Sequence, residues 1–357
     1  MIFIALFLLS GRVRAADVRE EVAEAVGAEE LEELAEGTGL SEYGSILGGY
    51  DIEGFLEKLL TEILRTVVSP DLFRDLGAVL TTVLLLAAVR TLAPVPTEGF
   101  DAASLACASG VMLLMSGTQH SLTVLAEETL VKLQDIANAL LPVLAAASLM
   151  SGQVTAAAAK YSAAALFLNV LTNLCCGFLL PLVRLYLAAA AAEAAVGSGV
   201  MSAVLGFLKW CGATVLSCLM LAFTLYLSLT SMASNAADAA IVRSAKTAVS
   251  AMLPVVGSIA GDAASSLLAA AGMIRQAVGA FGLLAISAAI LAPFCQTGIR
   301  YLLLKGVAAI SSELAESRMC RLLKRLSESM ALLMGCIGSC GLMLFFSVYS
   351  LMRAVGQ

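Results

Sequence analysis

Charged residues are scarce in this sequence of 357 residues, and their scarcity excludes a soluble globular fold. Only 13% of the residues are Asp, Glu, Lys or Arg, whereas a soluble domain typically carries about 25% to keep its surface hydrated. Hydrophobic residues make up 60%, and the mean hydropathy is +0.94. The apolar runs reach about 20 residues, the length that crosses about 30 Å of hydrocarbon as a helix. They lack the alternation of strands, which excludes a β-barrel, so we predict an all-α, polytopic integral membrane protein.

The residues that metal and redox centres need are also missing. His120 is the only histidine, and none of the nine cysteines forms a CxxC pair, so neither a zinc site nor a redox centre is predicted. No Walker-type loop and no recognisable nucleophile arrangement is present. No basic patch is interleaved with aromatic residues, as nucleic-acid binding requires. We therefore predict a protein without enzymatic activity, metal or other cofactor, and without nucleic-acid partners.

The first 70 residues differ in composition from the rest of the chain. Residues 1–16 contain a short apolar stretch followed by small residues, which predicts a signal peptide, or an uncleaved anchor because the basic n-region is missing. Between Asp17 and Glu62 there are 14 acidic residues against two basic ones. Acidic segments are translocated more readily than basic ones. We therefore predict that residues 17–70 form an acidic external helical region.

Residues 71–357 form the predicted multi-pass transmembrane domain. Two shorter apolar stretches, near 254–274 and 299–311, predict re-entrant or interfacial segments. The basic cluster at 318–325 predicts a cytoplasmic loop by the positive-inside rule, which places the C-terminus outside. The apolar runs predict six to eight transmembrane helices, with candidates near 74–93, 102–119, 136–152, 161–180, 182–197, 205–232, 276–296 and 328–352.

Two pairs of prolines suggest an internal repeat in this domain. Leu141-Pro142-Val143 is echoed 112 residues later by Leu253-Pro254-Val255, and Pro181 and Pro293 have the same offset. Repeats that carry broken helices are common in transporters, where the functional site lies between them. Because a sequence rich in Ala and Leu also produces such echoes by chance, both interpretations stay open here.

Ionisable residues inside apolar runs are functional candidates, because each costs a few kcal/mol in the membrane. Most lie near a predicted span end, where a long side chain can reach the interface. Asp262 differs, because its side chain is short and it shares a helical face with Ser258, Ser265 and Ser266. The interior set is Arg90, Lys160, Arg184, Glu193, Lys209, Asp262, Arg275 and Lys305.

The sharpest features lie between residues 238 and 282. A polar helical face, a proline and a GxxxG pattern follow one another, and the last of these allows close helix packing. One interpretation is a gate or a partner-binding helix, and the other is an interfacial helix packed on its neighbours. The candidate functional or packing residues are Arg243, Lys246, Pro254, Gly257, Gly261, Asp262 and Arg275.

A specific combination of residues runs from Ile241 to Gly282. Its features are Arg243, Ala245-Lys246, Pro254-Val255, Gly257, Asp262-Ala263, Val278-Gly279 and Phe281-Gly282. This combination resembles the stage III sporulation protein AE family. The layout is also similar over nearly the whole chain, with a signal-like start, an external N-terminal region and a polytopic remainder. The resemblance implies a role in endospore formation, in the mother-cell membrane that surrounds the engulfed forespore.

The resemblance further implies a membrane subunit of the channel, or feeding tube, that sustains the forespore and its late gene expression. The implied partners are the other stage III sporulation A-group membrane proteins, including an ATPase, and stage II sporulation protein Q. The alternative is a self-contained secondary transporter with a substrate site between two internal repeats. A transporter needs Asp262 in a cavity at mid-membrane depth, whereas a channel subunit can use it at a helix contact. A purely structural scaffold would tolerate neutral substitutions of Asp262 and Arg243.

Overall fold

The computed structural model is helical almost throughout the residues that it describes, which are 44–45, 49–50, 52–67, 70–92, 102–151, 154–196, 199–252, 257–314 and 317–352. The exception is a two-residue antiparallel ladder, in which β1 (Gly44–Ser45) pairs with β2 (Gly49–Tyr50). The helices are α4 (Ile52–Val67), α5 (Pro70–Leu92), α6 (Ala102–Met150), α7 (Val154–Leu174), the π-helical η2 (Cys175–Leu179), α8 (Leu180–Val196), α9 (Gly199–Met252), α10 (Gly257–Leu314) and α11 (Ser317–Met352).

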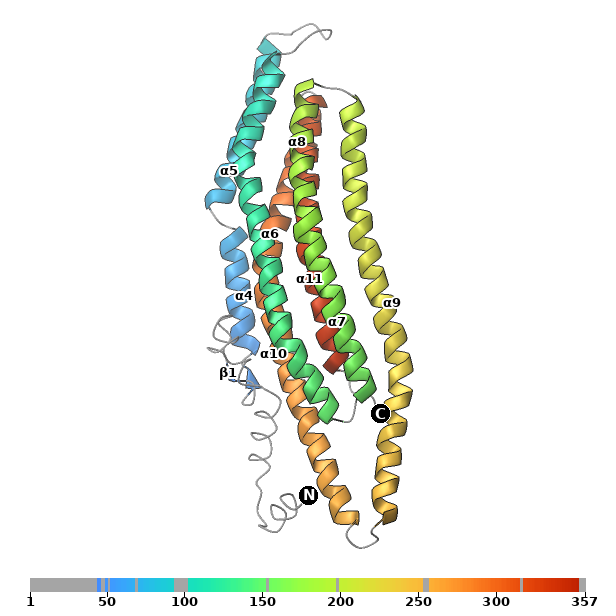
Figure 1. Ribbon diagram of the computed structural model, residues 1–357. Coiled ribbons are helices and arrows are strands. Elements are labelled where there is room, and N and C mark those ends of the chain that lie inside the picture. Colours follow the sequence, from blue (N-terminus) through green and yellow to red (C-terminus); the bar gives the residue numbers. More distant parts are fainter. Residues whose placement is uncertain are drawn as a thin grey trace.

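The long helices run up and down beside one another (Figure 1). In the view of Figure 1, α6, α9 and α11 descend, whereas α10 and the continuous rod of α7, η2 and α8 ascend. Helix α11 contacts α6, α7, α8, α9 and α10. Helix α5 packs on α6 and α10, and α4 packs on α10. Helix α4 lies within the predicted helical region of residues 17–70, and its Phe55 and Leu59 side chains are buried.

The predicted spans merge into fewer and longer helices. Among the described residues, five helices are long and apolar enough to cross a membrane: Leu105–Met150, Thr155–Ala195, Val200–Thr230, Leu268–Ser311 and Met319–Met352. Two predicted spans, 102–119 and 136–152, lie in α6 because the charged stretch between them consists largely of good helix formers. The stretches near 254–274 and 299–311 belong mainly to α10 and not to separate segments.

A single π-helical turn joins α7 to α8 without ending the rod. Leu180 donates its backbone N–H to the carbonyl oxygen of Cys175, five residues earlier. Pro181 follows directly and has no N–H to donate to the preceding turn. Widening of the helix before a proline is one of the known ways to accommodate the missing hydrogen bond and the ring. The predicted boundary between spans at 180–182 is therefore a local distortion of one helix.

Two further expectations from the sequence differ from the helix boundaries. The basic residues at 318–325 lie in the first turns of α11 and do not form a loop. The 112-residue offset does not relate equivalent helix ends, because the end of α6 at Met150 corresponds to position 262, inside α10. The helix boundaries therefore give no support to a structural repeat.

Glycines let neighbouring helices approach closely at the centre of the bundle. A Cβ atom added at Gly341 of α11 would collide with the side chain of Ile290 on α10. A Cβ atom at Gly282 of α10 would collide with the side chain of Leu140 on α6. Small residues drive helix association in membranes in this way, because lipid provides no hydrophobic force between helices.

Four helices share a charge-free layer, which we call the apolar layer. No Asp, Glu, Lys or Arg occurs in 161–183, 210–237, 276–299 or 329–352. These segments lie at one level, since Gly212 of α9 faces Leu332 of α11 at one end. At the other end, Lys160 of α7 donates a hydrogen bond to the Ser350 carbonyl of α11. A helical segment of 24 residues is about 36 Å long, which matches the thickness of a membrane core.

Candidate functional site

The residues predicted as functional lie mostly around the connection between α9 and α10. Five of them have helical backbone positions: Arg243 and Lys246 in α9, and Gly257, Gly261 and Asp262 in α10. Their side chains, and all of Pro254, lie outside the described residues. The polar face that contains Asp262 and the role of the GxxxG pattern therefore stay predictions.

Arg275 of α10 is the one residue of this set whose side chain is described, and it lies against the C-terminal end of α6. It is only 3% exposed, and its guanidinium donates a 3.0 Å hydrogen bond to Ser151 Oγ at the end of α6. Lys160, 4% exposed, donates to the Ser350 carbonyl at 2.8 Å. Both cations lie near the carbonyl end of α11 or α6, where a helix dipole favours positive charge. These hydrogen bonds connect α10 to the end of α6 and α7 to the end of α11.

A cluster of ionic side chains joins three helices at the upper end of the apolar layer. Arg325 of α11 donates from Nε to Glu193 of α8 at 3.1 Å and from a second nitrogen to Glu328 at 3.3 Å. Lys209 of α9 donates to the other oxygen of Glu328 at 2.9 Å. We call this set, with its two hydroxyl partners, the ion cluster; its members are Tyr186, Glu193, Ser202, Lys209, Arg325 and Glu328.

The ion cluster is electrically neutral, and each of its carboxylates accepts from at least one donor. Two carboxylates face two cations, and the Tyr186 hydroxyl donates to Glu328 at 2.6 Å. Ser202 Oγ accepts a third bond from Arg325 at 2.9 Å. Charge-assisted bonds of this kind are about twice as strong as neutral ones. Because Arg325 bonds to both α8 and α9, the cluster fixes the mutual position of three helices.

Sequence reasoning identified only part of the ion cluster. Glu193 and Lys209 belong to the interior ionisable set, whereas Arg325 was assigned to a cytoplasmic loop. Tyr186 and Glu328 are not among the predicted candidates. The spacing of Arg325 and Glu328 at i and i+3 is a local signal. Their partners on α8 and α9 are more than 100 residues away in the chain, so no local pattern indicates them.

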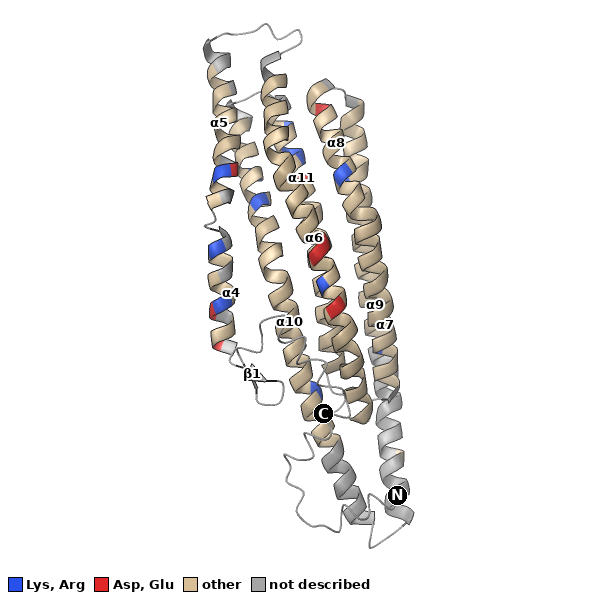
Figure 2. Cartoon of the chain, turned by 60° about the vertical axis from the view of Figure 1, so that its left-hand side comes forward, with Lys and Arg blue, Asp and Glu red and all other residues tan. Residues whose placement is uncertain are grey.

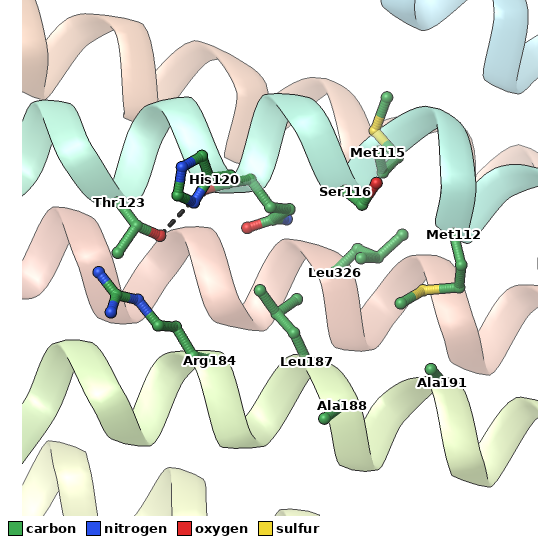
Figure 3. Close-up of a pocket in the computed structure, with 11 residues that line it drawn as sticks. Met112, Met115, Ser116, His120, Thr123, Arg184, Leu187, Ala188, Ala191 and Leu326 are labelled. Carbon is green, nitrogen blue, oxygen red and sulfur yellow. Dashed lines mark hydrogen bonds between the residues drawn. The ribbon is translucent and has the colours of Figure 1, made fainter.

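A cavity of about 210 Å³ lies beside the ion cluster, between α6, α8 and α11 (Figure 3). Helix α11 contributes to both, because Leu326 lines the cavity and its neighbour Arg325 belongs to the cluster. The lining is mainly apolar, with polar groups from α6 and α8. Its residues are Met112, Met115, Ser116, Gln119, His120, Thr123, Arg184, Leu187, Ala188, Ala191 and Leu326.

One face of α6 is polar at the depth of the apolar layer. This α6 polar face consists of Glu127, Glu128, Lys132, Asp135 and Asn138, which are all exposed. Figure 2 shows the charges of α6 at mid-height of the molecule. Helix α6 runs beside the layer here, since Leu140 faces Gly282 of α10. Each charge that faces lipid costs about 2.5–3.5 kcal/mol on insertion scales, so this face requires water or a polar partner.

Long apolar helices and an ionic cluster between them define the chain as a polytopic helical membrane protein. The family model described as stage III sporulation protein AE matches residues 51–355, which is most of the chain. The chain therefore belongs to the stage III sporulation protein AE family, as the residues between 241 and 282 indicated. None of the curated proteins and none of the solved structures compared with the chain matches it.

Proposed function

We propose that this protein is a membrane subunit of the channel, or feeding tube, between mother cell and forespore. In this role it lies in the mother-cell membrane around the engulfed forespore and supports late forespore gene expression. Its partners are the other stage III sporulation A-group proteins and stage II sporulation protein Q. We also propose that it is not an enzyme and that a partner ATPase provides the energy.

The α6 polar face is the observation that carries this proposal beyond the family. Four charges and one amide are exposed along a single face at the level of the apolar layer. Glu127 pairs with Arg184 of α8, and Asn138 accepts from Gln134. A subunit that worked alone in lipid would leave Glu128, Lys132 and Asp135 without water at a cost of several kcal/mol. Inside an assembly, the same face lines an aqueous passage. The secondary transporter remains the alternative, but the helix boundaries do not support the repeat on which it rested.

Deletion of the gene in a sporulating host tests the proposal. We expect engulfment to be completed, after which the forespores shrink and a late forespore reporter stays silent. Fluorescence microscopy of membranes and reporter in single cells measures both effects. Complementation with the wild-type gene serves as the control. Normal, heat-resistant spores in the deletion strain would contradict the proposed role.

A further inference from the structure

Helix α7 carries two asparagines on its exposed surface, near the middle of the apolar layer. Asn169 and Asn173 are both exposed and lie well inside the charge-free segment 161–183. Because they are four residues apart, they lie on one face of the helix, one turn from each other. The side-chain amide of Asn173 donates to the side-chain carbonyl oxygen of Asn169 at 2.6 Å. At this depth lipid provides no hydrogen-bond partner for what remains of the two amides.

The hydrogen bond between the two asparagines leaves most of their polar groups unused. Each side-chain amide has two N–H donors and a carbonyl oxygen that accepts twice. Within the part of the chain that the structure describes, the two side chains form no other hydrogen bond. Turning either amide exchanges its oxygen and nitrogen but does not lower the number of unused groups. The pair therefore needs polar partners from outside this part of the chain.

Exposed hydroxyl groups in the same layer do not have this need. Ser162 of α7 donates to the backbone carbonyl of Ala159, and Ser228 of α9 donates to that of Thr224. A hydroxyl has a single proton, so a carbonyl of its own helix is enough to accept it. The amide NH₂ groups cannot be satisfied in this way, which distinguishes the two asparagines from the other exposed polar residues of α7.

The asparagines belong to a row of exposed residues that has no charge and mostly short side chains. One large residue, Leu166, interrupts it and is 60% exposed. Short side chains let a second helix come close enough for hydrogen bonds between helices. We call this row the α7 amide face; it consists of Thr155, Ala158, Ser162, Leu166, Asn169 and Asn173, which are all exposed.

We propose that the α7 amide face binds the same face of a second copy of this protein within the membrane. All copies insert in one orientation, so Asn169 and Asn173 of both copies lie at the same depth. An amide both donates and accepts, and identical amides therefore satisfy one another across a two-fold axis along the membrane normal. The face carries no charge, so it needs no oppositely charged partner. Asparagines that pair between helices are a known source of helix association in membranes.

Sedimentation equilibrium of the full-length protein in density-matched detergent micelles measures the association. We expect a wild-type dimer, and we expect Asn169→Leu combined with Asn173→Leu to raise its dissociation constant at least about tenfold. Asn138→Leu is the matched control, because it removes an exposed amide from α6 and not from the α7 amide face. Thermal unfolding verifies that each variant is folded. A monomeric wild type, or a double variant that dimerises as tightly as the wild type, would overturn the proposal.

Oxidative cross-linking in membranes locates the contact independently of detergent. In a Cys218→Ser background, which lacks the exposed native thiol, copper phenanthroline should convert Leu166→Cys into a disulfide-linked dimer. Leu221→Cys of α9 is the control, because the two leucines are equally exposed, at 60% and 61%. Mass spectrometry of the linked peptides identifies the residues that are joined. The proposal fails if Leu166→Cys gives no linked dimer or no more of it than Leu221→Cys.

Discussion

Arg325 occupies a position where a single side chain connects three helices. Its guanidinium contacts Glu193 of α8, Ser202 of α9 and Glu328 in its own helix. Its side chain is only 15% exposed, and that of Glu193 is 6% exposed. A buried carboxylate that loses its cation keeps the cost of desolvation without the attraction that offset it. Removal of one partner from such an ion pair is therefore expected to lower the free energy of unfolding more than replacement of both partners by apolar residues.

We expect Arg325→Met to lower the free energy of unfolding by about 3 kcal/mol, because it leaves Glu193 and Glu328 short of positive charge. The double variant Glu193→Leu with Arg325→Met should recover most of this loss, since Glu328 keeps Lys209 and Tyr186. Thermal unfolding in detergent measures both. Lys324→Met, at the exposed position next to Arg325, is the control. Equal unfolding temperatures for Arg325→Met and this control would remove the ion cluster as a stabilising element.

The residues at the start of α10 lead to a second prediction at this scale. We expect Asp262→Asn and Pro254→Ala to impair sporulation without preventing membrane insertion. Asp262 is an acidic residue in an apolar helix, where such residues are retained mainly for function. Counts of heat-resistant spores, together with immunoblots of the membrane fraction, separate the two effects. Wild-type spore counts for both variants would refute the assignment of these residues to the site.

At the scale of the elements, the contact between α6 and α10 depends on the absence of a side chain. Gly282 lies against the side chain of Leu140, whereas Gly306 of the same helix has no atom within 4 Å of an added Cβ. The neighbouring Phe281 is fully buried. The Phe281-Gly282 pair, which resembled the family in sequence, therefore combines a large core side chain with a close helix approach.

We expect Gly282→Val to destabilise the protein by about 1–3 kcal/mol, as overpacking of a dense interior typically does. Gly306→Val is a matched control, because it adds the same β-branched residue to the same helix at an open position. The two variants share the change in helix propensity. The difference between their unfolding temperatures therefore isolates the steric term. If the two unfold at the same temperature, the close approach of α6 and α10 is not a source of stability.

At the scale of the whole molecule, the helices are longer than a membrane is thick. The span Leu105–Met150 has 46 residues, which is about 69 Å of helix, whereas a bilayer with its headgroups is about 40–45 Å thick. Because the apolar layer takes up one membrane thickness, the rods continue beyond it. The ion cluster and the cavity lie at the upper end of the apolar layer. At this end the helices continue into less apolar segments.

Water access along the α6 polar face is the prediction that concerns the assembly. We expect Lys132→Cys and Asn138→Cys to react with a charged, membrane-impermeant methanethiosulfonate in membranes of sporulating cells, because this face cannot be exposed to lipid. Mass spectrometry of the labelled peptides resolves the new thiols from the nine native cysteines. Leu221→Cys of α9, an apolar position that is 61% exposed, is the lipid-facing control. Protection of both α6 thiols to the level of this control would show that no aqueous passage runs along the face.

The sequence by itself determined the class of the protein and the stretch that indicates its family. Hydrophobic run length and helix propensity are local properties, so they predicted α9, α10 and α11 as membrane helices. The same local criterion divided α6 in two, because it treats the charges from Glu127 to Asp135 as an interruption of a span. A helix that has one face turned away from lipid tolerates such charges on that face. The mean hydropathy of a window does not show this, because it averages over all faces of the helix.

Only the tertiary structure decided which side chains meet. Glu328 contacts Tyr186 and Lys209, which are 142 and 119 positions away, and Gln119 meets Ser329 over 210 positions. Such pairings depend on how five rods are rotated about their axes, and rotation is set by packing at glycines and small residues summed over the whole bundle. The same rotation turns the α6 polar face outward and leaves the cavity beside Gln119. Composition fixes neither of these, because any rotation of α6 has the same composition.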